Sequence, residues 1–371
     1  MKSSPKESYV SHDIRLTRYA IVSTAVTLLS DEQLRERVED ATGLDAGIGG
    51  ATALMQIEET PIFVKIIPLT EKERLTENTM STENVFKLPP YCQYGIGSPG
   101  FSVWREVAAH TMTTNWVLAN HCASFPLMYH WRVLKSPERR TPISDELSDV
   151  SRMVEFWDTS KMRDRIEALE QSEYSVVLFC EYIPYNLHDW LSEQIAIGES
   201  KAASELSMVD LNLRSAVSFM NANKLHHFDL HFKNVLTDGN RVYISDFGLA
   251  TSSRFELSDS ELNFLEANKT HDGCYVVTTL VNWLVTALVG MVNRTERIDY
   301  IRRCTERDEL PEMMDSAAKI IMRYAPIAVV MNDFYTNLVS MSRTTIFPVE
   351  EIERICTKTG FDPFYSDAKL V

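Results

Sequence analysis

The chain has 371 residues, of which 44% are hydrophobic and 24% charged, and its 52 acidic and 37 basic residues give a formal net charge of −15. This apolar fraction is too high for an intrinsically disordered chain, and 13 Gly, 14 Pro and 6 Cys exclude a collagen-like or disulfide-scaffold protein. The acidic balance argues against general electrostatic binding to nucleic acid or to an anionic membrane. A phosphate-bearing partner must therefore be held by a specific site.

The cysteine pattern shows neither a CxxC pair nor a Cys/His cluster at metal-ligand spacing. Free thiols in a reducing, cytoplasmic compartment are therefore expected. Residues 19–29 form an apolar run that lacks a small-residue cleavage site, so we interpret it as a core segment rather than as a signal peptide.

One later run, residues 274–292, has 19 residues without a charge. A bilayer span needs about 20 apolar residues, so length alone permits a membrane helix. The run contains three Thr, an Asn and a Tyr, and no second span accompanies it. A buried core helix is therefore the favoured interpretation, and no membrane partner is expected.

The first half of the chain shows mainly strand signals. A capping box at Ser30 and Gln33 predicts a short helix that ends near Gly43, and residues 46–69 predict strand, Gly turn, strand, turn, strand. After a polar stretch to about residue 100, residues 101–120 have helical spacing, and residues 125–134 and 174–183 read as strands.

A charged insertion between those two strands suggests one or two surface helices. From residue 186 onward the pattern is mainly helical, with two short β runs near residues 235 and 243. The sequence thus predicts a β-rich first half and a helical second half.

The chemistry is concentrated in residues 225–250, LHHFDLHFKNVLTDGNRVYISDFGLA. Asp229 is followed five residues later by Asn234, and Asp246 comes after a short β run. Phosphoryl transfer needs a carboxylate near the acceptor hydroxyl and oxygen ligands that hold Mg²⁺ against the ATP phosphates. A unit of short strands and turns would bring these three side chains to one side.

This stretch resembles the HxDxxxxN and DFG motifs of the protein-kinase-like superfamily, and in particular a bacterial eukaryotic-like protein kinase. The resemblance covers about residues 43–295. It implies an α+β bilobal protein-kinase-like fold, with a β-rich N-lobe that carries a regulatory-type helix and a mainly helical C-lobe. It also implies ATP and Mg²⁺ as cofactors.

The expected domains are a helical N-terminal extension (1–42), an N-lobe (43–183) and a C-lobe (184–371). The N-lobe carries insertions at about 70–100 and 135–172. The resemblance implies that the helix beginning near residue 274 is buried in the C-lobe and that Asp272, at its start, braces the catalytic loop.

Roles follow from the same resemblance. Asp229 would orient or deprotonate the acceptor hydroxyl, and Asn234 and Asp246 would hold Mg²⁺. Lys65, in the strand IFVKII, looks like the lysine that reaches the nucleotide phosphates. It is preceded by a cluster that resembles the glycine-rich loop, Gly47, Gly49 and Gly50. A Gly cluster in a hairpin usually serves a turn, so this assignment depends on its context.

The partner of Lys65 and the adenine site are assigned in the same way. Glu106, in the predicted helix at residues 101–120, would pair with Lys65, and Glu83 is the competitor. Residues 174–183 resemble the last N-lobe strand and the hinge. The backbone of Glu181 and Ile183 would then contact adenine.

Several residues depart from the pattern of regulated kinases. Phe228 replaces the Arg that many of them carry before the catalytic Asp, so switching by loop phosphorylation is not expected. No APE motif follows the DFG, which puts conventional peptide docking in doubt. His231 gives the DLHxxN form of aminoglycoside and choline phosphotransferases and of haspin-like kinases. Lys233 either neutralises phosphate charge or is a solvated loop lysine, and His227 is expected to be a scaffold residue.

Three functions remain open. A Ser/Thr-type protein kinase is favoured by the DFG and the hinge, and a small-molecule phosphotransferase is favoured by DLHxxN and the missing APE. A nucleotide-binding pseudokinase module is disfavoured because Lys65, Asp229, Asn234 and Asp246 are all present. The expected partner is a protein substrate or a small hydroxylated molecule, with no nucleic acid.

Overall fold

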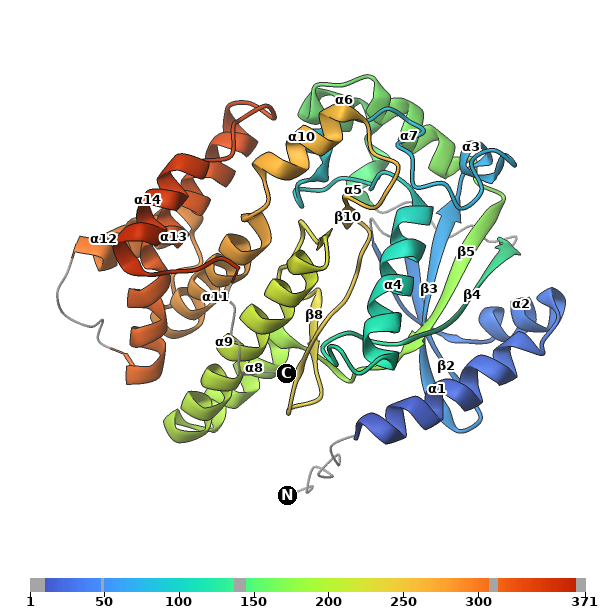
Figure 1. Ribbon diagram of the computed structural model, residues 1–371, viewed down its shortest axis with the longest axis horizontal. Helices are drawn as coiled ribbons and strands as arrows, with labels where there is room; N and C mark the ends of the chain where they lie inside the picture. Colours follow the sequence, from blue (N-terminus) through green and yellow to red (C-terminus); the bar gives the residue numbers. More distant parts are fainter. Residues whose placement is uncertain (1–10, 48–49, 137–144, 307–312, 365–371) are drawn as a thin grey trace.

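The computed structural model describes residues 11–47, 50–136, 145–306 and 313–364. It has a sheet-rich lobe and a helical lobe, which Figure 1 places on the right and on the left. The chain crosses from one to the other directly after strand β5. The predicted α+β bilobal fold is confirmed.

The N-lobe is built on one antiparallel sheet with the strand order β1-β2-β3-β5-β4. Its strands are β1 (Thr42–Gly47), β2 (Gly50–Ile57), β3 (Thr60–Leu69), β4 (Met128–Lys135) and β5 (Tyr174–Glu181). β3 and β5 lie in the middle and are rich in β-branched and aromatic residues, which suit a strand buried on both faces.

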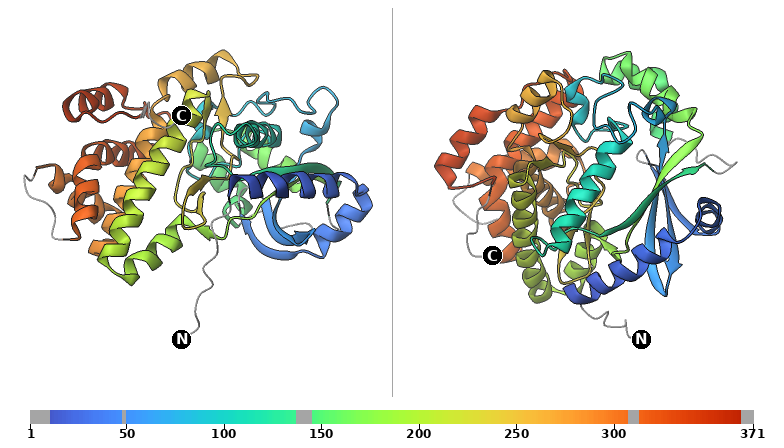
Figure 2. Two further views of the ribbon diagram at one scale, coloured as in Figure 1. Left: turned by 60° about the horizontal axis from the view of Figure 1, so that its bottom comes forward. Right: turned by 45° about the vertical axis from the view of Figure 1, so that its right-hand side comes forward.

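The alternation of side chains along β5 shows what covers each face. Val177 and Phe179 belong to the large core that also contains residues of the N-terminal helices, whereas Val176 and Leu178 pack with residues of helix α4 (Val103–Leu118). Helices α1 (His12–Thr27) and α2 (Asp31–Glu39) thus lie on one face of the sheet and α4 on the other (Figure 2). Lys65, in step with Ile67 and Leu69, is on the α4 side.

The N-terminal extension follows its sequence signals closely. The capping box of Ser30 and Gln33 is present. The helix ends at Asp40, which has a right-handed conformation. Gly43, the predicted end of the helix, lies in β1 and does not cap the helix. The apolar run at residues 19–29 belongs mostly to α1, where Val22 and Val26 are buried. The helix packs one face into the core, while Ile21 and Leu28 are exposed.

The second insertion forms helices where the sequence suggested them, and the two insertions pack against each other. They contain the short helices α3 (Glu71–Arg74), η1 (Pro90–Gln93), α5 (Asp145–Ser148), α6 (Val150–Trp157) and α7 (Lys161–Glu170). Phe86 and Phe101 of the first insertion share a hydrophobic cluster with Trp157 and Ile166 of the second. Each insertion alone has too few apolar residues for a core, and together they form one that lies at the top of Figure 1.

The C-lobe is mainly helical. Its helices are α8 (Leu187–Ile197), α9 (Glu199–Ala222), α10 (Asp259–Ala267), α11 (His271–Val289), α12 (Arg294–Glu306), α13 (Asp315–Ser340) and α14 (Val349–Thr359). Short strands complete it, with β6 (Tyr185–Asn186), β8 (Val235–Thr237) and β9 (Val242–Ile244) in one sheet and β7 (Leu225–His226) and β10 (Thr251–Ser252) in another.

The long apolar run lies in α11. Of the helices in the described residues, α11 alone is long and apolar enough to cross a membrane by length and composition. It packs against α9 and α13, and Leu280, Val281 and Leu284 are buried there. In this structure it is the core helix that the sequence favoured.

Candidate active site

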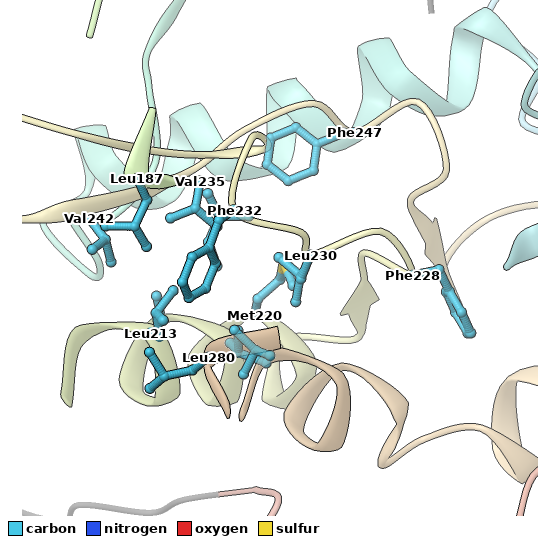
Figure 3. Close-up of a cluster of buried hydrophobic side chains, with 14 of the residues drawn as sticks. Leu187, Leu213, Met220, Phe228, Leu230, Phe232, Val235, Val242, Phe247 and Leu280 are labelled. Atoms are coloured by element: carbon cyan, nitrogen blue, oxygen red, sulfur yellow. The ribbon is translucent and has the colours of Figure 1, made fainter. Parts of the chain in front are cut away.

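The catalytic loop owes its shape to alternating side chains. Phe228, Leu230 and Phe232 are buried, and Figure 3 shows the last two beside Leu213 and Met220 of α9. The side chains of Asp229 and His231, which lie between them in the sequence, are partly exposed. Burial of the apolar set therefore fixes the exposed side of the loop, which carries Asp229.

Asp272, at the start of α11, holds the catalytic loop through hydrogen bonds to its backbone. Its buried carboxylate accepts the backbone N–H of His227 at 2.7 Å and of Phe228 at 2.9 Å, and the Asn221 amide at 2.9 Å. Burial raises the pKa of Asp272, but the bond to His271 and the nearby histidines outweigh it and hold that pKa well below its usual range. Phe228 has a φ of 64°, a left-handed conformation that this bracing holds in place.

Asp229 and Asn234 are in direct contact. The Asn234 amide N–H₂ donates to the Asp229 backbone oxygen at 2.9 Å and to its Oδ2 at 3.2 Å, and the Asp229 N–H donates to His227 Nδ1 at 3.2 Å. Because its nitrogen faces Asp229, the Asn234 side-chain oxygen is left for another partner. Burial raises the pKa of Asp229 above its ordinary value.

Lys65 lies between two carboxylates from different parts of the chain. Its Nζ donates to Glu106 Oε1 at 2.6 Å and to Asp246 Oδ1 at 2.8 Å. Burial lowers the pKa of Lys65, but the two carboxylates raise it more, so the ammonium stays charged. Glu106 rather than the exposed Glu83 meets Lys65, because α4 packs on the face of the sheet from which Lys65 projects.

The Asp246 carboxylate keeps its charge beside this ammonium. Burial acts to raise the pKa of Asp246, but the Lys65 charge and hydrogen bond hold it well below its usual range. Asp246 has a φ of 61°, and its Oδ1 also accepts the Gly248 N–H at 3.3 Å. Its side chain is 44% exposed, so an ionised carboxylate is presented to a ligand.

A column of rings connects the two lobes behind these charges. The Phe247 ring centroid lies 4.9 Å from His110 of α4 and 5.4 Å from His227 of the catalytic loop. Burial and the Lys65 charge lower the pKa of His110 to about 3, so the ring is neutral. The column ties the position of α4, and hence of Glu106, to the catalytic loop.

The glycine cluster forms the β1–β2 hairpin. Gly47 pairs with Gly50, and Lys65 pairs with Thr52, two residues along from the hairpin end. Gly50 has a φ of +115°, and a Cβ there would lie 2.2 Å from the Ile66 backbone oxygen, so only glycine fits. Gly49 lies outside the described residues. The hairpin therefore lies close to Lys65. The glycine at position 50 is explained by the close approach of the β3 backbone and does not by itself indicate a phosphate site.

The predicted hinge follows β5. The Glu181 N–H donates to the Leu127 backbone oxygen at 2.7 Å, while its side chain pairs with Arg15 of α1. Ile183 is buried two residues further on. The predicted contact of Glu181 and Ile183 backbone groups with adenine remains a prediction.

The other polar residues of the loop divide into scaffold and exposed groups. His227 Nε2 lies 2.9 Å from the Ser245 backbone oxygen and serves the scaffold, as expected. His231 is 42% exposed, with its Nε2 3.7 Å from Asp229 Oδ2, and Lys233 is exposed. Sequence reasoning identified neither Arg15 nor Gly95, which touches Asp229. Three glycines within residues 95–100 were the only local signal of such a close approach.

The oxygen ligands of this site suit a hard cation that is held jointly by the protein and by phosphate oxygens. Within the described ranges no group of three or more His, Cys, Asp or Glu side chains is placed to hold a metal alone. Asn234 and Asp246 offer an amide oxygen and a carboxylate, which are ligands that Mg²⁺ takes together with phosphate oxygens. The charged Lys65 beside them suits a phosphate.

The two lobes, the paired lysine and the braced catalytic loop define a protein-kinase-like protein. The family model for protein tyrosine and serine/threonine kinases matches residues 132–264, from β4 to α10. The human phosphorylase b kinase gamma catalytic chain, liver/testis isoform, is 34% identical over 86 residues, which are 23% of this chain and 20% of that protein. The Drosophila melanogaster serine/threonine-protein kinase fused is 32% identical over 120 residues, 32% of this chain and 14% of that protein.

These matches span a fifth or less of the length of the relatives. The range that the family model matches includes neither Lys65 nor Glu106. The N-lobe half of the site therefore rests on the strand order and on the contacts described above. Fold, site and matches together support a similarity of this chain to the protein-kinase-like superfamily.

Proposed function

We propose that this chain is a protein kinase that transfers the γ-phosphoryl group of ATP to Ser or Thr hydroxyls of a protein substrate. The observation that carries this proposal is the Lys65 ammonium held between Glu106 and Asp246, with Asp229 and Asn234 in contact on the facing loop. Four charged side chains, Lys65, Glu106, Asp229 and Asp246, and the neutral Asn234 amide supply the groups that phosphoryl transfer needs.

In this reaction the acceptor oxygen forms a bond to the γ-phosphorus, the bond from that phosphorus to the ADP oxygen breaks, and the acceptor proton passes to Asp229. Lys65 would bind the α- and β-phosphates, and Asn234 and Asp246 would hold Mg²⁺, which when bound neutralises phosphate charge. Burial raises the pKa of Asp229, which makes its carboxylate a stronger base for the acceptor proton.

The choice of a protein acceptor is supported by the matching family and by the two kinases similar to this chain. The second candidate is a small-molecule phosphotransferase, which the exposed His231 beside Asp229 favours. Cys92, Cys122, Cys180, Cys274 and Cys356 are free thiols, which supports the proposal of a reducing compartment such as the cytoplasm.

The test is transfer of labelled γ-phosphate from ATP with Mg²⁺ to a cell lysate fractionated by size. We expect label on macromolecules that disappears with Asp229→Ala and Asp246→Ala and persists with Asp40→Ala, a change of an exposed carboxylate at the end of α2. Label confined to small molecules would replace the protein kinase by the second candidate. Full metal-dependent transfer by Asp246→Ala would overturn the site assignment.

A further inference from the structure

A segment of the first insertion crosses the catalytic loop. This segment, residues 91–101, is called the strap here; it leaves helix η1 and leads to α4. Its Gly95 N–H donates to the backbone oxygen of Phe228, the residue before Asp229, at 3.3 Å. The strap therefore lies directly against the residue expected to receive the acceptor proton.

Gly95 touches the Asp229 side chain itself. A Cβ built on Gly95 would lie 2.1 Å from Asp229 Oδ1, 2.7 Å from its Cγ and 3.0 Å from its Cβ. Any side chain at position 95 must displace the carboxylate or the strap, because neither backbone nor carboxylate can occupy that space together with a methyl group. The Gly95 main chain thus limits one flank of the carboxylate.

The opposite flank is limited by the catalytic loop. Asp229 Oδ2 accepts the Asn234 amide at 3.2 Å and lies 3.7 Å from His231 Nε2. With Gly95 at Oδ1 and Asn234 at Oδ2, the rotation of the carboxylate is restricted from both sides. Proton transfer benefits from such restriction, because the rate depends steeply on the placement of the accepting oxygen.

The strap is itself anchored in the C-lobe. Tyr94 is buried, its hydroxyl donates to Asn268 Oδ1 at 2.7 Å, and its ring packs edge-on against Phe264 at 5.2 Å and Phe334 at 5.3 Å. The Gln93 amide also donates to the Leu249 backbone oxygen. The strap is therefore held in place directly before Gly95 by contacts that do not depend on Asp229.

We propose that Gly95 is a positioning residue for Asp229 and that the Gly95 main chain forms one wall of the acceptor site. This inference rests on the proposed function, because it assigns Asp229 the acceptor proton. It predicts that the acceptor hydroxyl reaches the carboxylate past His231, the partly exposed neighbour, and not from the strap side.

The test compares Gly95→Ala with Gly97→Ala in the full chain. Gly97 has a φ of +96° and nothing within 4 Å of a Cβ, so its substitution strains the strap backbone without touching Asp229. We measure kcat and KM for ATP with Mg²⁺ and casein as the acceptor, and the affinity for a fluorescent ADP analogue. Gly95→Ala should lower kcat by about tenfold or more, with KM for ATP and ADP affinity nearly unchanged, whereas Gly97→Ala should largely keep kcat.

One further readout separates positioning from folding. A double-mutant cycle on the free energy of unfolding should show coupling, because Gly95→Ala costs less when Asp229→Ala has removed the carboxylate.

Additive effects in that cycle, or equal loss of kcat in the two glycine variants, would overturn the inference. No transfer by the unaltered chain, with coupling still present in the cycle, would overturn the proposed function while the Gly95–Asp229 contact stands. The two failures are therefore distinguishable.

Discussion

Arg15 and Glu181 form a buried ion pair with two hydrogen bonds, which joins the N-terminal helix to the end of β5. Arg15 Nε and Nη2 donate to the two Glu181 carboxylate oxygens at 2.8 and 2.7 Å. The remaining guanidinium donors bind the backbone oxygens of Ala123 at 2.9 Å and Phe125 at 2.6 Å, and Glu181 Oε2 also accepts the Leu127 N–H. The extension thus fixes the segment from which the predicted hinge begins.

Removal of Arg15 should be costly because it leaves a buried carboxylate without its charge partner. We expect Arg15→Met to lower the free energy of unfolding by about 3–5 kcal/mol, as measured by urea titration. Arg35→Met, which removes an exposed cation of α2 that pairs with Glu32 and Glu39, is the control and should have a much smaller effect. A second change, Glu181→Leu, should restore part of the loss in the Arg15 variant. Equal effects of the two Arg variants would contradict this role.

The proton-accepting role of Asp229 predicts a particular pH dependence. Burial raises the pKa of Asp229 above the ordinary value of 3.8, and only the ionised form can take the acceptor proton. Transfer should therefore fall on the acid side at a pH above 3.8, in a range where the chain is still folded. Asp229→Asn should lower kcat by about 10²- to 10⁴-fold at every pH. The check is a pH profile of kcat beside circular dichroism at each pH, and an acid limb that coincides with unfolding would refute the assignment.

His110 should make the fold sensitive to mild acid. Its pKa is lowered from 6.5 to about 3, so between these values the unfolded chain binds a proton that the folded chain does not. The contribution of His110 to the free energy of unfolding is therefore fully present above pH 6.5. It decreases as the pH falls, by up to about 1.4 kcal/mol per pH unit.

The measurement is the free energy of unfolding at pH 7.5 and pH 5.0 for the unaltered chain and for His110→Gln. The difference between the two pH values should be smaller in the variant, because Gln does not titrate. The matched control is Ser192→Ala, at an exposed position of α8 without an ionisable group, which should leave the difference unchanged. An equal pH dependence in all three chains would show that His110 does not contribute.

The sequence predicted the elements whose signals are local. Ser30 and Gln33 carry a complete capping box within four residues, and the HxDxxxxN and DFG motifs lie within residues 225–250. The bilobal fold was predicted because its motifs are short runs in a fixed order.

What the sequence did not predict depends on contacts between distant segments. Arg15 and Glu181 are 166 residues apart, and no spacing rule relates them. The apolar residues of each insertion showed no partner in the sequence. Phe86 of the first insertion is buried in one cluster with Trp157 of the second. Such pairs are decided by packing and not by periodicity.

The last prediction concerns the absence of a phosphorylation switch. Arg105 of α4, adjacent to Glu106, donates to Glu261 Oε1 of α10 at 2.7 Å, and both side chains are buried. In kinases regulated by phosphorylation, a phosphate added to the loop after the DFG orders that loop by pairing with arginine. Here Glu261 supplies a permanent negative charge in this loop region, so α4 and α10 are joined without modification.

We therefore expect phosphatase treatment to leave kcat unchanged, and Glu261→Gln to lower both kcat and stability. The variant leaves Arg105 buried without a counter-charge, which should cost about 3–5 kcal/mol, while a Gln can still accept the Ser258 N–H that caps α10. Glu266→Gln, at an exposed position of the same helix, is the control and should have little effect. Loss of activity after phosphatase treatment would show that a phosphate, and not the Glu261 carboxylate, holds the active arrangement.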